Sequence, residues 1–293
     1  MPPNTIAAKF EAYGKEKNLI EEKIYYFNKL GESSELAEYN NKNVSSHDLL
    51  EWTYSNGRSV WEYAIKTDSS NLEEFIKTKW EIMKKSIKDG LHIEGGLPDS
   101  NINTRRASLF LSRAMQNRDF IQPISKTMAY AMAIAEENVS AKEVVAAPTA
   151  KSAGVIPSVL TILMETYKVS ETRIIRGLIT AGFIGKLLFK QIIDGDTHSD
   201  IIIASAMASG AAVQILGGTP RQVIAAAAIS LNSLKANHEI QENSHLDYVE
   251  LNGIAAANAI NNATLALLSD NSLSKEIDFF DELTQWNRQA INC

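Results

Sequence analysis

The spacing of apolar and polar residues along the chain predicts helices and few strands. Between residues 75 and 87 the apolar positions recur close to every 3.6 residues, and lysines and glutamates occupy the other face. The apolar positions are Phe75, Ile76, Trp80, Met83 and Ile87. The clearest strand signal, residues 143–147, is short and is followed by Pro148. The pattern therefore predicts an all-α fold.

Three later stretches consist almost entirely of alanine, serine and glycine: residues 204–212, 225–228 and 255–257. Helices with such small side chains can approach closely, so we expect these three to form the centre of a helical bundle. Residues 219–222, Thr-Pro-Arg-Gln, have the cap, first-turn proline and glutamine of a helix start. The glycines at 217–218 favour a helix end just before it.

The domain organisation is read from a change in composition near residue 105, where a Lys/Glu-rich region gives way to an alanine-rich one. We interpret this change as periphery against core, because no long linker or repeat separates the two regions. The prediction is a helical N-terminal extension at residues 1–59 and one multi-helix domain at residues 60–293.

Charge and cysteine content narrow the function classes. The net charge of −6 and the pI near 5.5 supply no basic face, which argues against nucleic acid or an acidic membrane as partner. The polar start lacks the features of a signal peptide, and the uncharged run at residues 201–220 suits a buried helix better than a membrane span, so we expect a cytoplasmic protein. The single cysteine, Cys293, excludes an internal disulfide and a cysteine-ligated metal site within one chain.

The loop at residues 144–158, Val-Val-Ala-Ala-Pro-Thr-Ala-Lys-Ser-Ala-Gly-Val-Ile-Pro-Ser, is the first candidate binding site. Small residues allow a ligand to approach the backbone, and a helix that starts near Pro157 would attract an anion. Thr149 and Ser152 add hydroxyl groups. A tight turn between two core helices explains the same residues equally well.

This loop resembles the Ala-Pro-Thr-x-Gly-x-x-Gly-x-x-Pro loop of the α-domain of iron–sulfur L-serine dehydratases. Other elements of that family follow in matching order over roughly residues 60–285. They are Glu94–Pro98, Arg105–Ser108, Glu136–Asn138, Ala204–Ala208, Leu216–Pro220 and Asn252–Ala259. Several separated motifs in one order are more specific than any one of them, and the family's α-domain is helical, as the periodicity predicts.

The resemblance implies a lyase of amino-acid metabolism. In the family, the open iron of a [4Fe–4S] cluster acts as a Lewis acid on the serine hydroxyl while a base removes the α-proton, and the product decays to pyruvate and ammonia. It also implies a small, amino-acid-like anionic substrate that contacts Glu94, Arg105, Arg106 and Asn138. For Arg105 and Arg106, a bidentate clamp on a carboxylate and a structural ion pair with Glu94 are both open.

The cluster ligands are absent from the positions where the family has them. The family's Gly-Cys-Gln-x-Glu-Val-Gly aligns with residues 196–202, so that Thr197 stands in place of the first cysteine. The family's Cys-Asp-Pro falls near residues 237–239 and its Pro-Cys near residues 247–248. Cys293 ends the chain too early to match a further family cysteine. We therefore expect no [4Fe–4S] cluster and assign no firm cofactor.

Histidines and carboxylates occupy the replaced segments. Thr197, His198, Asn237 and His238 are candidates for substrate contact, and a divalent metal could be held by His198, Asp200, His238, Glu239 and His245. The spacing matches no standard metal motif. Solvated surface loops have the same composition, and we favour that interpretation.

Lys151 stands where the family has glycine, inside the loop. A lysine at a helix start faces the positive end of the helix dipole, so it either points into solvent or serves a purpose. As catalytic group, alongside Thr149 and Ser152, it could pair with a substrate anion, act as a base or form an imine. Asn232 and Asn258, among small residues, are further candidates for buried hydrogen bonds near the pocket.

Two function classes remain open. The first is a cluster-free lyase that removes water, phosphate or a similar group from a small amino acid or related acid. The second is a non-catalytic binding or partner subunit with the same scaffold. The family's β-domain is absent from this chain, so a separate β-like subunit could be the partner, and a homodimer is plausible. We lean to the lyase, because the Ala-Pro-Thr loop and the two arginines are retained.

Overall fold

The computed structural model describes residues 6–13, 19–27, 46–67, 71–97, 104–116, 121–188, 197–235, 246–269 and 274–285. The chain divides into two compact units, Met1–Val44 and Ser45–Cys293, and each is described by itself.

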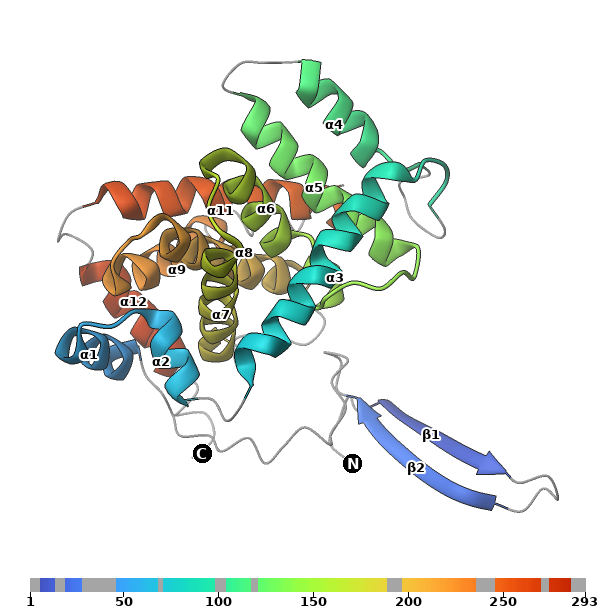
Figure 1. Ribbon diagram of the computed structural model, residues 1–293, viewed down its shortest axis with the longest axis horizontal. Helices are drawn as coiled ribbons and strands as arrows, with labels where there is room; N and C mark the ends of the chain where they lie inside the picture. The colour runs from blue at the N-terminus through green and yellow to red at the C-terminus, as the bar shows by residue number, and fades with distance from the viewer. Residues whose placement is uncertain are drawn as a thin grey trace. The chain divides into compact units, whose positions relative to one another are not determined.

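The first unit contains a two-stranded antiparallel hairpin (Figure 1). Strand β1 is Ile6–Tyr13 and strand β2 is Leu19–Phe27, with Ile6 opposite Phe27 and a register shift next to Tyr13. The prediction of a helical extension over residues 1–59 is therefore wrong at residues 6–13 and 19–27, which form strands. The reason lies in their sequences: β1 alternates apolar and polar residues with period two over most of its length, and β2 is rich in isoleucine and aromatic residues.

The second unit is helical throughout its described elements. Its first five helices, in chain order, are α1 Ser46–Asn56, α2 Val60–Thr67, α3 Leu72–His92, α4 Ala107–Gln116 and α5 Ile121–Val139. The single-turn helix η1 Ala150–Ser152 leads into α6 Val155–Tyr167 and α7 Glu171–Leu188. The remaining elements are α8 Thr197–Leu216, α9 Pro220–Lys235, α11 Tyr248–Leu268 and α12 Ser274–Gln285. The all-α prediction is confirmed for this unit.

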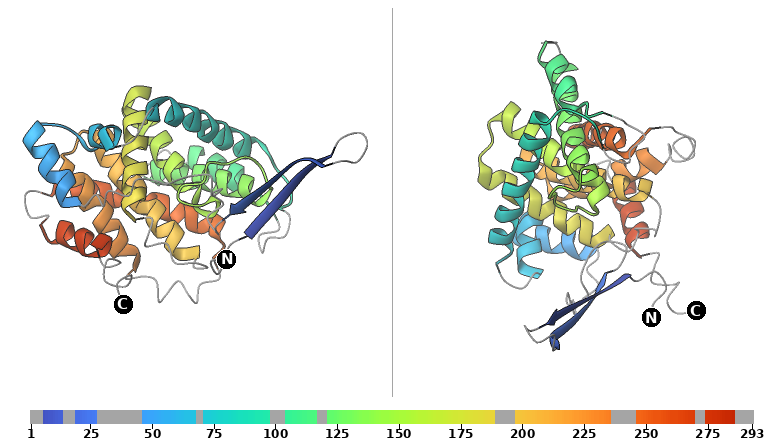
Figure 2. Two further views of the ribbon diagram at one scale, coloured as in Figure 1. Left: turned by 90° about the horizontal axis from the view of Figure 1, so that it is seen from below. Right: turned by 90° about the vertical axis from the view of Figure 1, so that its right-hand side faces the viewer.

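Helix α8 lies at the centre of the bundle, packed against α7, α9 and α11 (Figure 1 and Figure 2). Serine hydroxyls join the three small-residue helices where they approach. Ser205 donates to the Ala255 carbonyl at 3.0 Å, and Ser230 donates to Ser205 at 2.9 Å. The small residues thus allow close packing, and local hydrogen bonds satisfy the polar groups they bury. The prediction of a centre built from alanine-rich helices is confirmed.

The helix boundaries follow the sequence signals. Helix α3 contains the periodic stretch at residues 75–87, and its Trp80 is fully buried. At the start of α9, the Thr219 amide donates to Gln222 Oε1 at 2.9 Å and the Gln222 amide to Thr219 Oγ1 at 3.3 Å. Gly217 ends α8 with φ of +86°. Among the described helices, none combines the length and apolarity that crossing a membrane would require.

Candidate functional site

The candidate loop runs from the end of α5 to the start of α6, which begins at Val155 rather than near Pro157. Thr149 caps η1 in a reciprocal capping box with Ser152, in which each side chain faces the other residue's backbone amide. Gly154 precedes α6 at a point of close approach: a Cβ there would lie 2.2 Å from the Ala131 carbonyl oxygen of α5. The loop therefore requires glycine at this position to lie against α5.

Helix α11 fixes the loop through Asn252, which is fully buried. Its Oδ1 accepts from the Gly154 amide at 3.1 Å, and its Nδ2 donates to the Lys151 carbonyl and to the Tyr248 carbonyl, both at 2.7 Å. One amide side chain thus holds both ends of the Lys151–Gly154 turn. The sequence did not single out Asn252 as a site residue, and the two asparagines chosen instead are less buried: Asn232 is exposed and Asn258 half-buried.

Helix α8 contacts the loop from another direction. The Thr149 hydroxyl donates to Asp200 Oδ2 at 3.0 Å, and these residues are only 9% and 8% exposed. Asp200 lies in the first turn of α8, three residues after Thr197. The start of α8 therefore contacts the loop through a carboxylate.

Three helix starts converge at the loop, because α6 begins within it and both α8 and α11 contact it near their first turns. Asp247 caps α11 in a capping box with Glu250. The amino ends of helices carry partial positive charge, so their convergence favours an anionic ligand.

The other loop residues divide into a buried and an exposed group. Ser152 is fully buried, and its hydroxyl lies 3.3 Å from the Thr149 carbonyl and 3.4 Å from the Ala147 carbonyl. Lys151 is exposed, while its carbonyl is held by Asn252. A catalytic role for Thr149, Lys151 and Ser152 stays a prediction.

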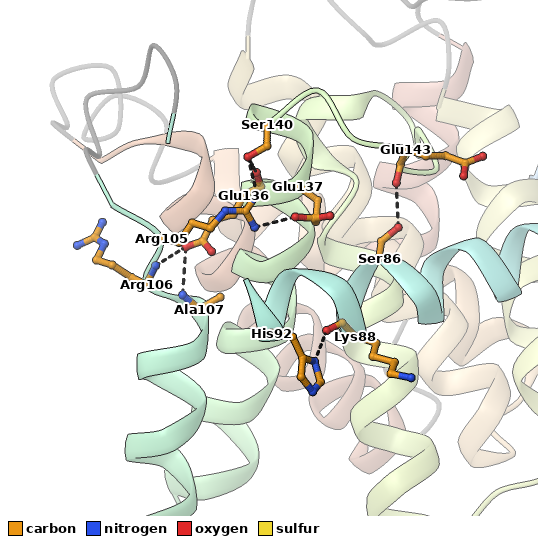
Figure 3. Close-up of polar contacts among 10 residues, drawn as sticks. All are labelled: Ser86, Lys88, His92, Arg105, Arg106, Ala107, Glu136, Glu137, Ser140 and Glu143. Atoms are coloured by element: carbon orange, nitrogen blue, oxygen red, sulfur yellow. Dashed lines mark hydrogen bonds and ion pairs between the residues drawn. The ribbon is translucent and has the colours of Figure 1, made fainter. Parts of the chain in front are cut away.

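Arg105 forms a buried ion pair with α5, shown in Figure 3. Its Nη1 lies 2.7 Å from Glu137 Oε1, and both side chains are about 95% buried, with 4% and 5% of their surface exposed. Its Nη2 donates to Ser140 Oγ at 2.5 Å. Glu94 is exposed, so the structural partner of Arg105 is Glu137 and not the glutamate that the sequence suggested.

The Glu136 carboxylate accepts hydrogen bonds from the backbone at the start of α4 (Figure 3). Its Oε1 accepts from the Arg106 amide at 2.7 Å and from the Ala107 amide at 3.1 Å. The side chain is fully buried, and Oε2 has no hydrogen-bond partner within the described part of the chain. Burial raises the pKa of Glu136, and the two amides and the nearby Arg105 and Arg106 oppose that rise only in part.

Arg106 and Asn138 connect this cluster to the start of α11. The Arg106 guanidinium pairs with Glu250, and the Asn138 side chain is hydrogen-bonded to Tyr248. Burial and the neighbouring Asp247 raise the pKa of the Tyr248 hydroxyl, which that hydrogen bond offsets in part. Both arginines are thus engaged in pairs that join α4, α5 and α11, and their role as a substrate clamp stays a prediction.

Several predicted positions cannot be compared with the structure. Asn237, His238, Glu239, His245 and Cys293 lie outside the described residues, and Thr197 and His198 are described by their backbone in the first turn of α8. Within the described ranges, no three His, Cys, Asp or Glu side chains form a group suited to a metal. The divalent-metal hypothesis therefore stays open.

The residues present do not fit the cluster that the resemblance implies. A [4Fe–4S] cluster is held by several cysteine thiolates, and this chain has one cysteine. At two aligned segments the structure has the backbone start of α8 at Thr197 and the cap of α11 at Asp247. Neither residue offers a thiolate.

Comparison with known sequences identifies the protein family to which the chain belongs. The sequence model of the serine dehydratase alpha chain family matches residues 28–235, more than half of the chain. The chain therefore belongs to the serine dehydratase alpha chain family.

Individual proteins with similar sequences are named L-serine dehydratase or its alpha chain. The chain is 32% identical over 221 residues to an L-serine dehydratase of Streptomyces coelicolor, covering 72% of this chain and 48% of that protein. It is 29% identical over 255 residues to L-serine dehydratase TdcG of Escherichia coli, covering 83% and 54%. It is 38% identical over 188 residues to the L-serine dehydratase alpha chain of Peptoniphilus asaccharolyticus, covering 58% and 64%. The chain thus spans about half the length of the first two relatives.

Proposed function

We propose that this chain is a lyase that eliminates a β-substituent from a small amino acid or related acid without an iron–sulfur cluster. Membership of the serine dehydratase alpha chain family supports the reaction class, and so do relatives named L-serine dehydratase. The absence of cysteine from the aligned ligand positions supports the cluster-free form.

The observation that carries the proposal is the loop at residues 147–154, held between α8 and α11. Asp200 fixes it at Thr149, and Asn252 fixes it at Lys151 and Gly154. Since ligand groups must be held in a defined geometry for catalysis, a loop fixed by three side-chain contacts suits substrate binding. Its position at converging helix starts suits a carboxylate or a phosphate.

The leaving group follows from the missing Lewis acid. Hydroxide leaves poorly unless its charge is stabilised, and this chain cannot supply the family's iron in the family's way. Phosphate leaves more readily than hydroxide, so we propose O-phosphoserine as a substrate beside serine. In the loop, Lys151 carries the side chain suited to pair with an anion or to act as the base that removes the α-proton.

A substrate screen tests the proposal. Purified protein is incubated with L-serine, L-threonine, L-cysteine and O-phospho-L-serine, and release of pyruvate or 2-oxobutyrate is measured. We expect product from at least one of them, and no product from any would contradict the lyase. Lys151→Ala should abolish the activity without lowering the unfolding midpoint. Lys142→Ala, at an exposed lysine that precedes residues 147–154, is the matched control and should retain the activity.

The alternative function, a non-catalytic partner subunit, gains support from the arginines. Arg105 and Arg106 pair with Glu137 and Glu250, so folding alone explains their retention. A β-like subunit is the partner that the family suggests. An inactive substrate screen, together with a stable complex between the chain and a separately expressed β-like subunit in size-exclusion chromatography, would favour this alternative.

A further inference from the structure

We propose that Arg106 is a positioning residue that acts on the loop at residues 147–154 through α11. Its ion pair with Glu250 fixes the first turn of that helix, and Asn252 on the same helix fixes the loop. The inference rests on the proposed function only in that the loop is taken as the substrate site. It assigns Arg106 to the geometry of that site, whereas a substrate clamp would act on the ligand itself.

The Glu250 carboxylate ties two helix starts together. Its Oε1 pairs with the guanidinium of Arg106, one residue before α4, and its Oε2 accepts from the Asp247 amide at 3.2 Å in the cap of α11. Arg106 is itself held from α5, because its amide donates to Glu136 Oε1 at 2.7 Å (Figure 3). The position of α11 at Glu250 is therefore coupled to the positions of α4 and α5.

Asn252 connects that helix start to the loop. Successive residues of an α-helix are about 100° apart, so Glu250 and Asn252 lie on roughly opposite sides of α11. Both polar atoms of the buried Asn252 side chain are engaged. Its Oδ1 accepts from the Gly154 amide at 3.1 Å, and its Nδ2 donates to two backbone carbonyls at 2.7 Å, one of them in the loop. A shift of the first turns of α11 must then move the loop or break these hydrogen bonds.

Arg105 is the matched control in the same segment. Its guanidinium pairs with Glu137 and donates to Ser140, so these contacts join the start of α4 to the end of α5. Its side chain is 4% exposed, against 35% for Arg106. Removing Arg105 should therefore destabilise the fold more than removing Arg106 does, but it should leave α11 and the loop joined as before.

Hydrogen exchange of the free protein, followed by NMR, tests the inference without a substrate. The Gly154 amide donates to Asn252, so its exchange reports whether α11 still holds the loop. Amides at the centre of α8 serve as the reference for global unfolding. We expect Arg106→Ala to speed exchange at Gly154, relative to this reference, by roughly two- to thirtyfold, as couplings through packed side chains predict. A substrate clamp predicts no change in the free protein.

Three further variants separate the ion pair from other effects. Glu250→Gln removes the charge but keeps an acceptor for the cap of α11, and it should act like Arg106→Ala. Arg106→Lys keeps the charge and should restore most of the protection. Arg105→Ala should leave the ratio of Gly154 exchange to α8 exchange within about twofold of wild type, although it destabilises the fold.

A double variant tests whether Arg106 acts through Asn252. Asn252→Ala releases the loop from α11, so adding Arg106→Ala to it should speed loop exchange no further. Mass spectrometry of peptides that cover residues 147–154 measures exchange in this background. Two effects that simply multiply would show that Arg106 and Asn252 act independently, which would overturn the inference.

The remaining contrary results are distinct. Unchanged Gly154 exchange in Arg106→Ala and Glu250→Gln would overturn the inference, and so would an equal rise in Arg105→Ala, which would indicate general loosening. If Arg106→Ala does not fold by circular dichroism, Glu250→Gln decides. Faster loop exchange together with an inactive substrate screen would contradict the lyase but support the inference. Product formation with unchanged exchange would support the lyase and overturn the inference.

Discussion

Arg105 and Glu137 show how a side chain suited to ligand binding can serve the fold. Their ion pair is almost completely buried, so removing one partner leaves a charge without compensation in the interior. We predict that Arg105→Ala lowers the free energy of unfolding by about 3–5 kcal/mol in urea denaturation.

The control for this prediction is the exposed ion pair between Arg58 and Glu62. Glu62 lies on α2, and Arg58 lies just before that helix. Arg58 is 60% exposed, and exposed pairs of this spacing contribute little. Arg58→Ala should therefore change the free energy of unfolding by less than about 1 kcal/mol. A loss in Arg105→Ala no larger than in this control would show that the buried pair does not stabilise the fold.

Glu136 gives a prediction about pH. Its pKa is raised by burial above the unperturbed value of 4.5, so the folded protein binds a proton that the unfolded chain has already released as pH rises. The side chain's contribution to stability is thus fully present below the unfolded pKa and is lost as pH rises through the folded pKa. We expect the stability of wild type relative to Glu136→Gln to be greater at pH 4.5 than at pH 7.5.

Urea denaturation of both proteins at the two pH values measures this difference, and the glutamine keeps an acceptor for the Arg106 and Ala107 amides. A relative stability of wild type that instead grows with pH would mean that the amides dominate and that the pKa of Glu136 is lowered.

Individual residues also show which parts of the candidate site could be predicted from the sequence. Thr149 and Asp200 were both named as candidates, since hydroxyl and carboxylate groups have recognisable chemistry. Their contact was not predicted, because it joins positions 51 residues apart. Asn252 was missed for the same reason: its partners are backbone atoms of a distant loop, and no spacing in the sequence encodes them.

At the scale of elements, Gly154 is where α6, α5 and α11 meet. A Cβ there would lie 2.2 Å from the Ala131 carbonyl oxygen and 3.0 Å from Asn252 Oδ1, and backbone cannot move aside cheaply. We predict that Gly154→Ala destabilises the protein by about 1–3 kcal/mol through overpacking and weakens ligand binding at the loop.

Gly182 on α7, unlike Gly154, has room for a side chain. Nothing lies within 4 Å of a Cβ built there, and the residue is exposed. Gly182→Ala should stabilise the protein by about 0.5–1 kcal/mol, because alanine favours a helix. Thermal denaturation of both variants measures the two effects on stability. A Gly154→Ala protein as stable as Gly182→Ala would contradict the close approach of Gly154 to the Ala131 carbonyl.

Elements were predictable where one local signal dominated. The 3.6-residue period predicted α3, and the cap at Thr219 predicted the start of α9. The hairpin of β1 and β2 was not predicted, because each strand is only eight or nine residues long and carries a short apolar pattern. Short apolar segments do not distinguish strand from helix by composition alone.

At the scale of the whole molecule, the chain belongs to the serine dehydratase alpha chain family and has a single cysteine, too few to hold an iron–sulfur cluster alone. We predict that the purified protein is colourless, without the band near about 400 nm and the acid-labile sulfide of an iron–sulfur cluster. Elemental analysis of the same sample for zinc, manganese and iron tests the divalent-metal hypothesis: a stoichiometric metal would support it, and a metal-free sample would contradict it.

The most direct test of a cluster-free lyase is the rate of pyruvate release from the best substrate before and after anaerobic reconstitution with iron and sulfide. We predict turnover before reconstitution, in the presence of an iron chelator, with no increase afterwards. Activity that requires reconstitution would contradict the central claim.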